Sequence, residues 1–274
     1  MGWVLAAALG AAAGWGTSDF LAGVLGRRMP VLTILIGSNL AAMVLALLVV
    51  AVRGVAPVWD GRVWPAVVAG FLGLPAMGLL YRAMRDGSAA VVAPVAAVAA
   101  LVPVGWGLLH GERLGLGAGL GVACGLAGVT LASWPVPGGQ RPRTQRLANL
   151  CALGAALGFG AYFVLLHEAG AADQLWAITF ARITEGLIGL VLAVLIRPKL
   201  RLRVPVLAVG VSDVLADAAF VASAAEALTP AAVVASLYPA VTLMLNRSFL
   251  RERLHTVHLY GVIAAVLSVA CLAR

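Results

Sequence analysis

The 274-residue chain is 62% apolar and 11% charged, whereas soluble domains are roughly 45 to 50% apolar and about 25% charged. This composition excludes a water-soluble fold and indicates an integral membrane protein. The net charge of +8 does not indicate nucleic-acid binding, because the basic residues form short clusters between apolar stretches, as expected of residues that flank a membrane.

Apolar stretches separated by charges, prolines and glycines predict ten transmembrane helices. A bilayer core about 30 Å thick needs about 20 apolar residues for each helical crossing. The first stretch has no preceding basic region and is longer than a signal-peptide core, so we expect a retained first helix. The predicted helices span residues 2–26, 30–52, 63–83, 87–110, 114–134, 147–168, 172–196, 204–226, 229–250 and 255–273.

The longest polar connection lies near the midpoint of the chain. Residues 135–146 are rich in proline, glycine and arginine, as a linker would be. We therefore expect two units, residues 1–134 and residues 147–274, with five helices in each.

An internal repeat relates these two units. Three short matches occur in the same order in both, and their offsets fall only from 144 to 142 to 140 residues, which chance in an alanine-rich and glycine-rich chain does not explain. Because each unit has an odd number of helices, the second enters the membrane from the opposite face, and we expect inverted repeats like those of secondary transporters. The matches pair residues 8–16 with 152–160 (seven of nine identical), 88–93 with 230–235, and 112–114 with 252–254.

Several residues of these repeats resemble the EamA-type branch of the drug/metabolite transporter superfamily. The resemblance lies in Trp15-Gly16, Phe159-Gly160, Pro239, Glu252-Arg253-Leu254 and Gly261. It implies helices 1 to 4 and 6 to 9 around a central cavity, cytoplasmic termini, and transport of small solutes such as amino acids, sugars or drugs. The first half departs from the pattern, because Ala99 stands where the second half has its proline.

Five ionisable residues fall inside predicted spans, where each costs about 2.5 to 3.5 kcal/mol on insertion scales and is a functional candidate by default. Asp19 lies in the first helix. Arg182 and Glu185 share one face of the seventh helix, and Asp213 and Asp217 share one face of the eighth. We expect these faces to meet across an internal cavity. Four acids against one arginine leave carboxylates that must be protonated, hydrated or matched by a cationic ligand. The alternative is that Arg182 is a structural partner of Glu185 or Asp213 that locks the two helices together.

The ninth predicted helix carries Tyr238, Thr242 and Asn246, which form a candidate hydrogen-bonding wall for a solute. The alternative is interhelical hydrogen bonding between packed helices. Tyr162 and Ser18 are weaker candidates, since such residues in apolar segments commonly serve in helix contacts.

Two arguments disagree about orientation. Of the 19 basic residues, 13 fall in loops predicted to share one side of the membrane. The positive-inside rule then places both termini outside, whereas the resemblance places them in the cytoplasm. The sequence leaves both orientations open.

These observations favour a secondary transporter of a small organic solute such as a metabolite, amino acid, amine or drug. The chain has no GxxxxGK[ST] loop, which would bind ATP to drive transport directly. Proton coupling or substrate exchange is therefore expected. We expect no enzyme activity, metal or cofactor. The alternatives are an intramembrane enzyme acting on a lipid-linked substrate and a structural membrane subunit. The expected partners are the solute, protons and the lipid bilayer, in a monomer or homodimer. An excess of arginine over lysine is typical of GC-rich coding and favours the bacterial plasma membrane.

Overall fold

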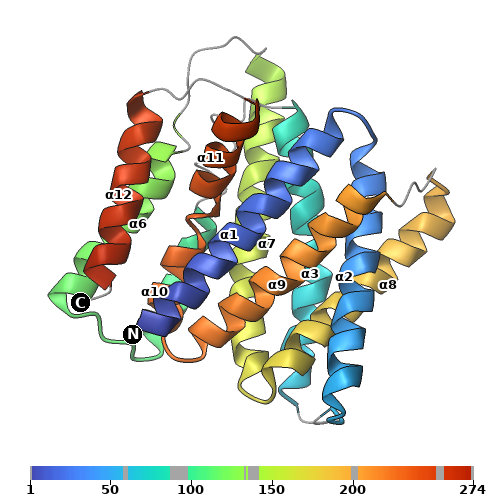
Figure 1. The fold of residues 1–274 in the computed structure, drawn as a ribbon, viewed down its shortest axis with the longest axis horizontal. Coiled ribbons are helices and arrows are strands. Elements are labelled where there is room, and N and C mark those ends of the chain that lie inside the picture. Colours follow the sequence, from blue (N-terminus) through green and yellow to red (C-terminus); the bar gives the residue numbers. More distant parts are fainter. Residues whose placement is uncertain are drawn as a thin grey trace.

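In the computed structural model, every regular element of the described residues is a helix (Figure 1). The description covers residues 2–57, 61–86, 98–132, 134, 142–198, 203–250 and 256–272. The predicted all-α class is therefore confirmed.

The first half contains α1 (Gly2–Gly26), α2 (Val31–Arg53), α3 (Val63–Asp86), a short 3-10 helix η1 (Val98–Ala100), α5 (Leu101–Leu109) and α6 (Leu116–Ala132). Residues 87–97 of the helix predicted at 87–110 lie outside the described residues. The 3-10 turn falls at Ala99, the position that corresponds to Pro239 of the second half. The chain thus departs from regular α-helix here without a proline.

The second half contains α7 (Pro142–Gly170), α8 (Gln174–Ile196), α9 (Val204–Ala224), α10 (Leu228–Ala235), α11 (Tyr238–Leu250) and α12 (Thr256–Leu272). Helix α7 begins inside the segment predicted as a linker. The single helix predicted at 229–250 is divided into α10 and α11. Pro239 lies in the first turn of α11 and has no backbone N–H to continue the α-helical ladder, which accounts for the break.

Seven helical segments of the described chain are long and apolar enough to cross a bilayer. They are Gly2–Gly26, Val31–Arg53, Val63–Ala83, Arg146–Gly170, Gln174–Ile196, Val204–Ala224 and Leu228–Phe249. Two shorter apolar helices, Leu116–Gly128 and Leu259–Ser268, belong to α6 and α12. The protein is therefore a multi-pass membrane protein.

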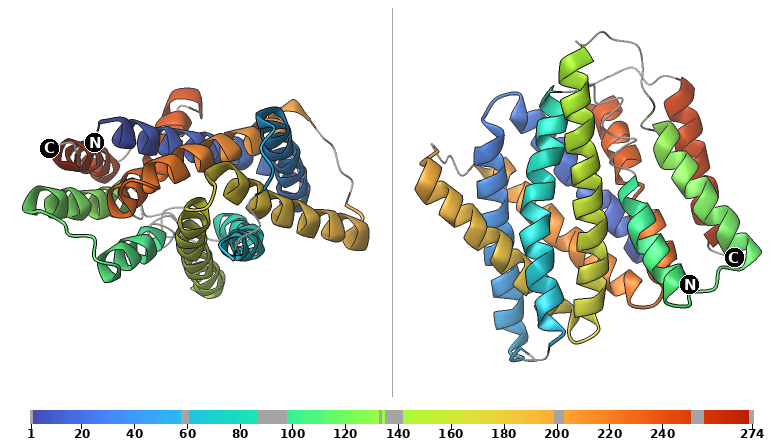
Figure 2. Two further views of the ribbon diagram at one scale, coloured as in Figure 1. Left: turned by 90° about the horizontal axis from the view of Figure 1, so that it is seen from below. Right: turned by 180° about the vertical axis from the view of Figure 1, so that it is seen from behind.

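The helices of the two halves are interleaved rather than separate. Helix α1 lies against α9, α7 lies against α3, and α2 lies against α8. Figures 1 and 2 show α6 and α12 side by side at one edge of the molecule. The remaining helices therefore form the body in which a solute site can lie.

Small residues allow two of these crossings. A Cβ atom built on Gly14 would come within 2.7 Å of the Cβ of Ala216, and one on Gly158 within 2.8 Å of the Cβ of Ala76. Both distances are too short for carbon atoms, so only glycine permits α1 to approach α9, and α7 to approach α3, this closely.

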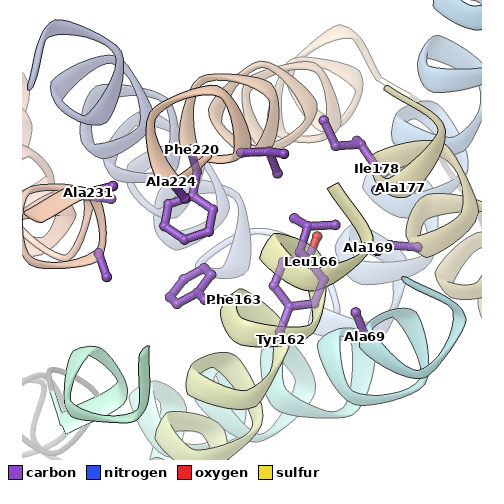
Figure 3. Close-up of a cluster of buried hydrophobic side chains, with 14 of the residues drawn as sticks. Ala69, Tyr162, Phe163, Leu166, Ala169, Ala177, Ile178, Phe220, Ala224 and Ala231 are labelled. Carbon is purple, nitrogen blue, oxygen red and sulfur yellow. The ribbon is translucent and has the colours of Figure 1, made fainter. Parts of the chain in front are cut away.

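The two ends of the helix bundle differ. Both termini lie at the lower end in Figure 1, which also holds the α7–α8 and α9–α10 connections and which we call the terminal end. A cluster of buried apolar side chains fills the half of the bundle nearer this end (Figure 3). It includes Phe163, Leu166, Ile178, Phe220 and Ala231. At the opposite end lie the α1–α2 connection, the end of α8 and the start of α9. We call it the basic end, because Arg27, Arg28 and Arg203 lie there.

Candidate functional site

A cavity lies about midway along the helices, between α1, α3, α7, α8, α9 and the start of α11. It encloses about 520 Å³ of empty space, counting the part open to solvent. Six charged or phenolic residues predicted from the sequence line it: Asp19, Arg182, Glu185, Asp213, Asp217 and Tyr238. The rest of its lining is mostly apolar and aromatic, the composition expected of a small-molecule site.

Arg182 organises one side of this cavity. Its Nη1 donates to Oε2 of Glu185 at 2.7 Å, and its Nη2 and Nε donate to Oδ2 of Asp217 at 2.7 and 3.0 Å. The hydroxyl of Tyr162 donates to the same Oδ2 at 2.8 Å. Arg182 is only 4% exposed, and its two carboxylate partners are buried as well. The planar guanidinium thus joins α8 to α9 through two charge-assisted contacts.

Gly73 of α3 makes room for this network. A Cβ atom on Gly73 would collide with Oε1 of Glu185 and would approach the ring of Tyr162 to 3.1 Å. The Glu185 carboxylate therefore lies directly against the α3 backbone.

The other side of the cavity holds two acids without a bound cation. Asp19 on α1 and Asp213 on α9 both line this side, and in the described part of the chain neither forms a salt bridge. The charge of Arg182 affects Asp213 without a hydrogen bond between the two side chains in the described contacts. The Ser18 hydroxyl lies near Asp213. The phenol of Tyr81 lies near both acids, and its buried oxygen has no hydrogen-bond partner among the residues that the structure describes.

An aromatic layer forms the floor of the cavity toward the terminal end. The ring centroid of Trp15 lies 4.9 Å from that of Phe163, 5.6 Å from that of Phe220 and 6.5 Å from that of Tyr238. Figure 3 shows Phe163 of α7 and Phe220 of α9 pointing toward one another, and their centroids are 5.0 Å apart. Both rings belong to the buried apolar cluster, which extends from the cavity toward the terminal end.

The sequence matches the EamA-like transporter family over residues 2–134 and 146–274. The chain belongs to this family. Its fold is also similar to that of a solved crystal structure whose title names no function. The two chains share 18% sequence identity with a TM-score of 0.79, and the match covers 98% of this chain and 96% of the other. No curated protein matches the sequence.

In this EamA-like protein, two residues of the predicted site lie elsewhere. The hydroxyl of Thr242 donates to the backbone oxygens of Gly16 at 3.0 Å and Tyr238 at 3.1 Å. It therefore links α11 to α1, as in the alternative interpretation of this residue. Asn246 lies further along α11 and is not among the residues that line the cavity.

The alternative interpretation of Arg182 named Glu185 or Asp213 as its structural partner. In the structure Arg182 pairs with Glu185 and also with Asp217. Tyr162, a weaker candidate in the sequence, lines the cavity and binds Asp217.

The aromatic floor, Tyr81 and the role of Gly73 were not predicted from the sequence. Aromatic residues in an apolar span fit lipid contact and core packing equally well, so composition alone does not select Phe163 or Tyr81. Trp15 could have been found, because its Trp-Gly pair is part of the internal repeat. Within the described residues, no group of three histidine, cysteine or acidic side chains is arranged to hold a metal ion.

Proposed function

We propose that this protein is a secondary active transporter that carries a small organic solute through the central cavity by alternating access. The observation that supports this best is the cavity itself, which is lined by three buried carboxylates, the half-buried Asp19 and one buried arginine, about midway along membrane-crossing helices. Ionisable groups at this depth are costly and mark substrate or ion pathways in membrane proteins.

The proposal includes ten membrane crossings arranged as two inverted five-helix repeats, at residues 1–134 and 147–274. Equivalent contacts in the two halves support it. A Cβ on Gly16 of α1 would lie 2.8 Å from the Tyr238 oxygen, and one on Gly160 of α7 would lie 2.8 Å from the Ala99 oxygen. The first helix of each repeat thus meets the fourth helical region of the other repeat in the same way. Such symmetry allows a protein to alternate between two states in which the same site opens to opposite sides of the membrane.

The buried apolar cluster supplies one of the two barriers that alternating access requires. It fills the space between the cavity and the terminal end, where α7, α8, α9 and α10 converge. We propose that this barrier opens when the solute is released toward that end, while the helices at the basic end close.

The buried acids are proposed to provide the coupling. In one state Asp213 or Asp217 takes up a proton or the amine of a substrate, and in the other state it releases that group. Proton coupling and exchange of one solute for another both fit this arrangement. We further propose that the protein resides in the plasma membrane of a bacterium, as a monomer or homodimer.

A transport assay with the purified protein in liposomes tests the function. Labelled amines, amino acids, sugars and aromatic acids are offered with and without an imposed pH gradient, and the recovered solute is analysed chemically. A transporter moves at least one solute unchanged. Chemical conversion of the solute would favour the intramembrane enzyme, and no movement in either direction would contradict the proposal.

Matched variants test whether transport depends on the carboxylates of the cavity. Asp213→Asn and Asp217→Asn each remove a cavity carboxylate, whereas Glu226→Gln removes one that is exposed at the terminal end. We expect the first two to lower transport or to change its pH profile, and the third to transport like wild type. If all three correctly inserted variants transport with the wild-type pH profile, the coupling role of these aspartates is wrong.

A further inference from the structure

The charges of the cavity are distributed unevenly between its two sides. On the α8 side, all three guanidinium nitrogens of Arg182 already donate to Glu185 or Asp217, at 3.0 Å or less. The two carboxylates already balance its charge, and these hydrogen bonds leave only two of its five N–H groups for an anionic solute. The arginine is therefore a poor receptor for a substrate carboxylate or phosphate.

The α1 side has the opposite character. Asp19 and Asp213 come from helices of different halves and both line the cavity, yet the described residues offer neither of them a salt bridge. Within the described residues, the buried phenol oxygen of Tyr81 and Oδ1 of Asp217, which lines the cavity, have no hydrogen-bond partner. Buried polar atoms are normally hydrogen-bonded, so this region lacks a donor group that a ligand can supply.

Aromatic rings lie next to these acids. Trp15 is four residues before Asp19 on α1, so both side chains face the same way. The Tyr238 ring meets Trp15 edge-on, at an interplanar angle of 80°, and both rings line the cavity together with Asp19. Carboxylates beside aromatic faces are the combination that binds ammonium groups, through charge and through cation–π attraction.

We propose that Asp19 and Asp213 form a subsite for an organic ammonium cation, with the apolar or aromatic body of the solute against Trp15, Phe163 and Tyr238. This inference rests on the proposed transport function and names its substrate class. The cation neutralises the acid pair, and the aromatic floor excludes water from around the body of the solute. The Arg182 network then positions α8 and α9 and does not contact the charge of the solute.

Binding of three small probes of similar size tests the proposal on the purified full-length protein. Benzyltrimethylammonium carries a permanent positive charge, benzyl alcohol is neutral, and phenylacetate is negative. We expect the cation to bind and to raise the melting temperature, and the other two to bind at least about tenfold more weakly. Equal binding of the three probes, or preference for phenylacetate, would overturn the inference.

Variants locate the subsite. Asp19→Asn and Asp213→Asn are expected to weaken binding of the cation by about tenfold each, and Glu226→Gln is expected to leave it unchanged. If either aspartate variant fails to fold, Trp15→Leu provides a second test, because it keeps all charges and removes the nearest aromatic face. Unchanged affinity in the folded cavity variants would contradict the proposed subsite.

Transport of the same probes separates this inference from the broader proposal. If liposomes that contain the protein take up phenylacetate faster than protein-free liposomes, but do not take up the cation, transport stands and the cation subsite is wrong. If the cation binds and no solute of the wider panel is moved, the subsite stands and the transport proposal is wrong.

Discussion

Asp217 of α9 is bound to Arg182 of α8 through two hydrogen bonds, of 2.7 and 3.0 Å, inside a membrane protein. Asp217 is 0% exposed, so water cannot replace the guanidinium if the contact is lost. Breaking a buried pair by removing one partner costs about 3 to 5 kcal/mol, because the other charge stays buried without compensation.

We therefore expect Arg182→Gln to lower the free energy of unfolding by about 3 to 5 kcal/mol. Asp217→Asn is expected to act in the same direction. The Arg182→Gln, Asp217→Asn double variant should lose less than the sum of the two single variants, since it leaves fewer uncompensated charges. Unfolding curves of the wild type, the two single variants and the double variant, recorded in the same detergent, measure these free energies. Strictly additive losses would show that the two side chains do not stabilise each other.

A second prediction concerns the crossing of α1 and α9. Gly14→Ala places a methyl group 2.7 Å from the Cβ of Ala216, so the helices must separate and the protein should be destabilised by about 1 to 3 kcal/mol. Gly23→Ala on the same helix is the matched control, because a Cβ there meets nothing within 4 Å. The control should be neutral or stabilising by up to about 1 kcal/mol, through its better helix propensity. Melting temperatures compare the two, and equal effects would argue against a tight crossing.

A third prediction concerns pH and the start of α8. Burial acts to raise the pKa of the Asp173 carboxyl, but the hydrogen bond from Arg53 and those from the N–H groups of Trp176 and Leu175 outweigh it and hold the pKa below its ordinary value. Arg53 Nη1 lies 2.7 Å from Oδ1 of Asp173. A carboxyl with a lowered pKa in the folded state stabilises the protein above its unfolded-state pKa. That contribution is lost as the pH falls through the folded-state value.

We expect Asp173→Asn to melt below wild type at neutral pH, since asparagine can still cap the helix but cannot pair with Arg53. The difference should shrink in the acid range, below about pH 4, where the wild-type carboxyl takes up its proton. Parallel melting curves from pH 7 downward measure it. A difference that stays constant with pH would mean that the ionised form of Asp173 contributes nothing.

The sequence predicted the positions of most helices, but it did not predict where a helix is interrupted. The predicted span 2–26 coincides with α1. In the bilayer, the backbone N–H and C=O groups of such an apolar run find hydrogen-bond partners in few structures other than a helix. The division of the ninth span before Pro239 was missed, since hydropathy is continuous across residues 229–250. A proline there interrupts the helix without changing its polarity.

The site was predicted as a set of residues but not as a set of pairs. Charges inside apolar spans stand out because they are costly, which identified Arg182 and the acids. Asp213 and Asp217 share one face and differ by about one helical turn, or about 5.4 Å along the axis. Which of them meets Arg182 depends on how far α9 is shifted along α8. Spacing within one helix carries no information about that shift.

The last prediction concerns sidedness, for which the charges of the two ends give a direction. In the described residues, Arg27, Arg28, Arg146, Arg197 and Arg203 lie at the basic end. The terminal end carries fewer basic residues and more acids, among them Glu112, Glu168, Asp173 and Glu226. Because basic residues are retained on the cytoplasmic side during insertion, we expect the basic end to face the cytoplasm and both termini to lie outside.

Reporter fusions decide between this orientation and the cytoplasmic termini that the family resemblance implies. Alkaline phosphatase joined to the carboxyl terminus should be active, since it folds only outside the cytoplasm, and a green fluorescent protein at the same place should be dark. Fusions in the α8–α9 connection, at Arg197, should show the reverse and serve as the control. A fluorescent carboxyl-terminal fusion would mean that the basic residues do not set the orientation, and that the cavity is closed by the apolar cluster toward the cytoplasm instead of toward the outside.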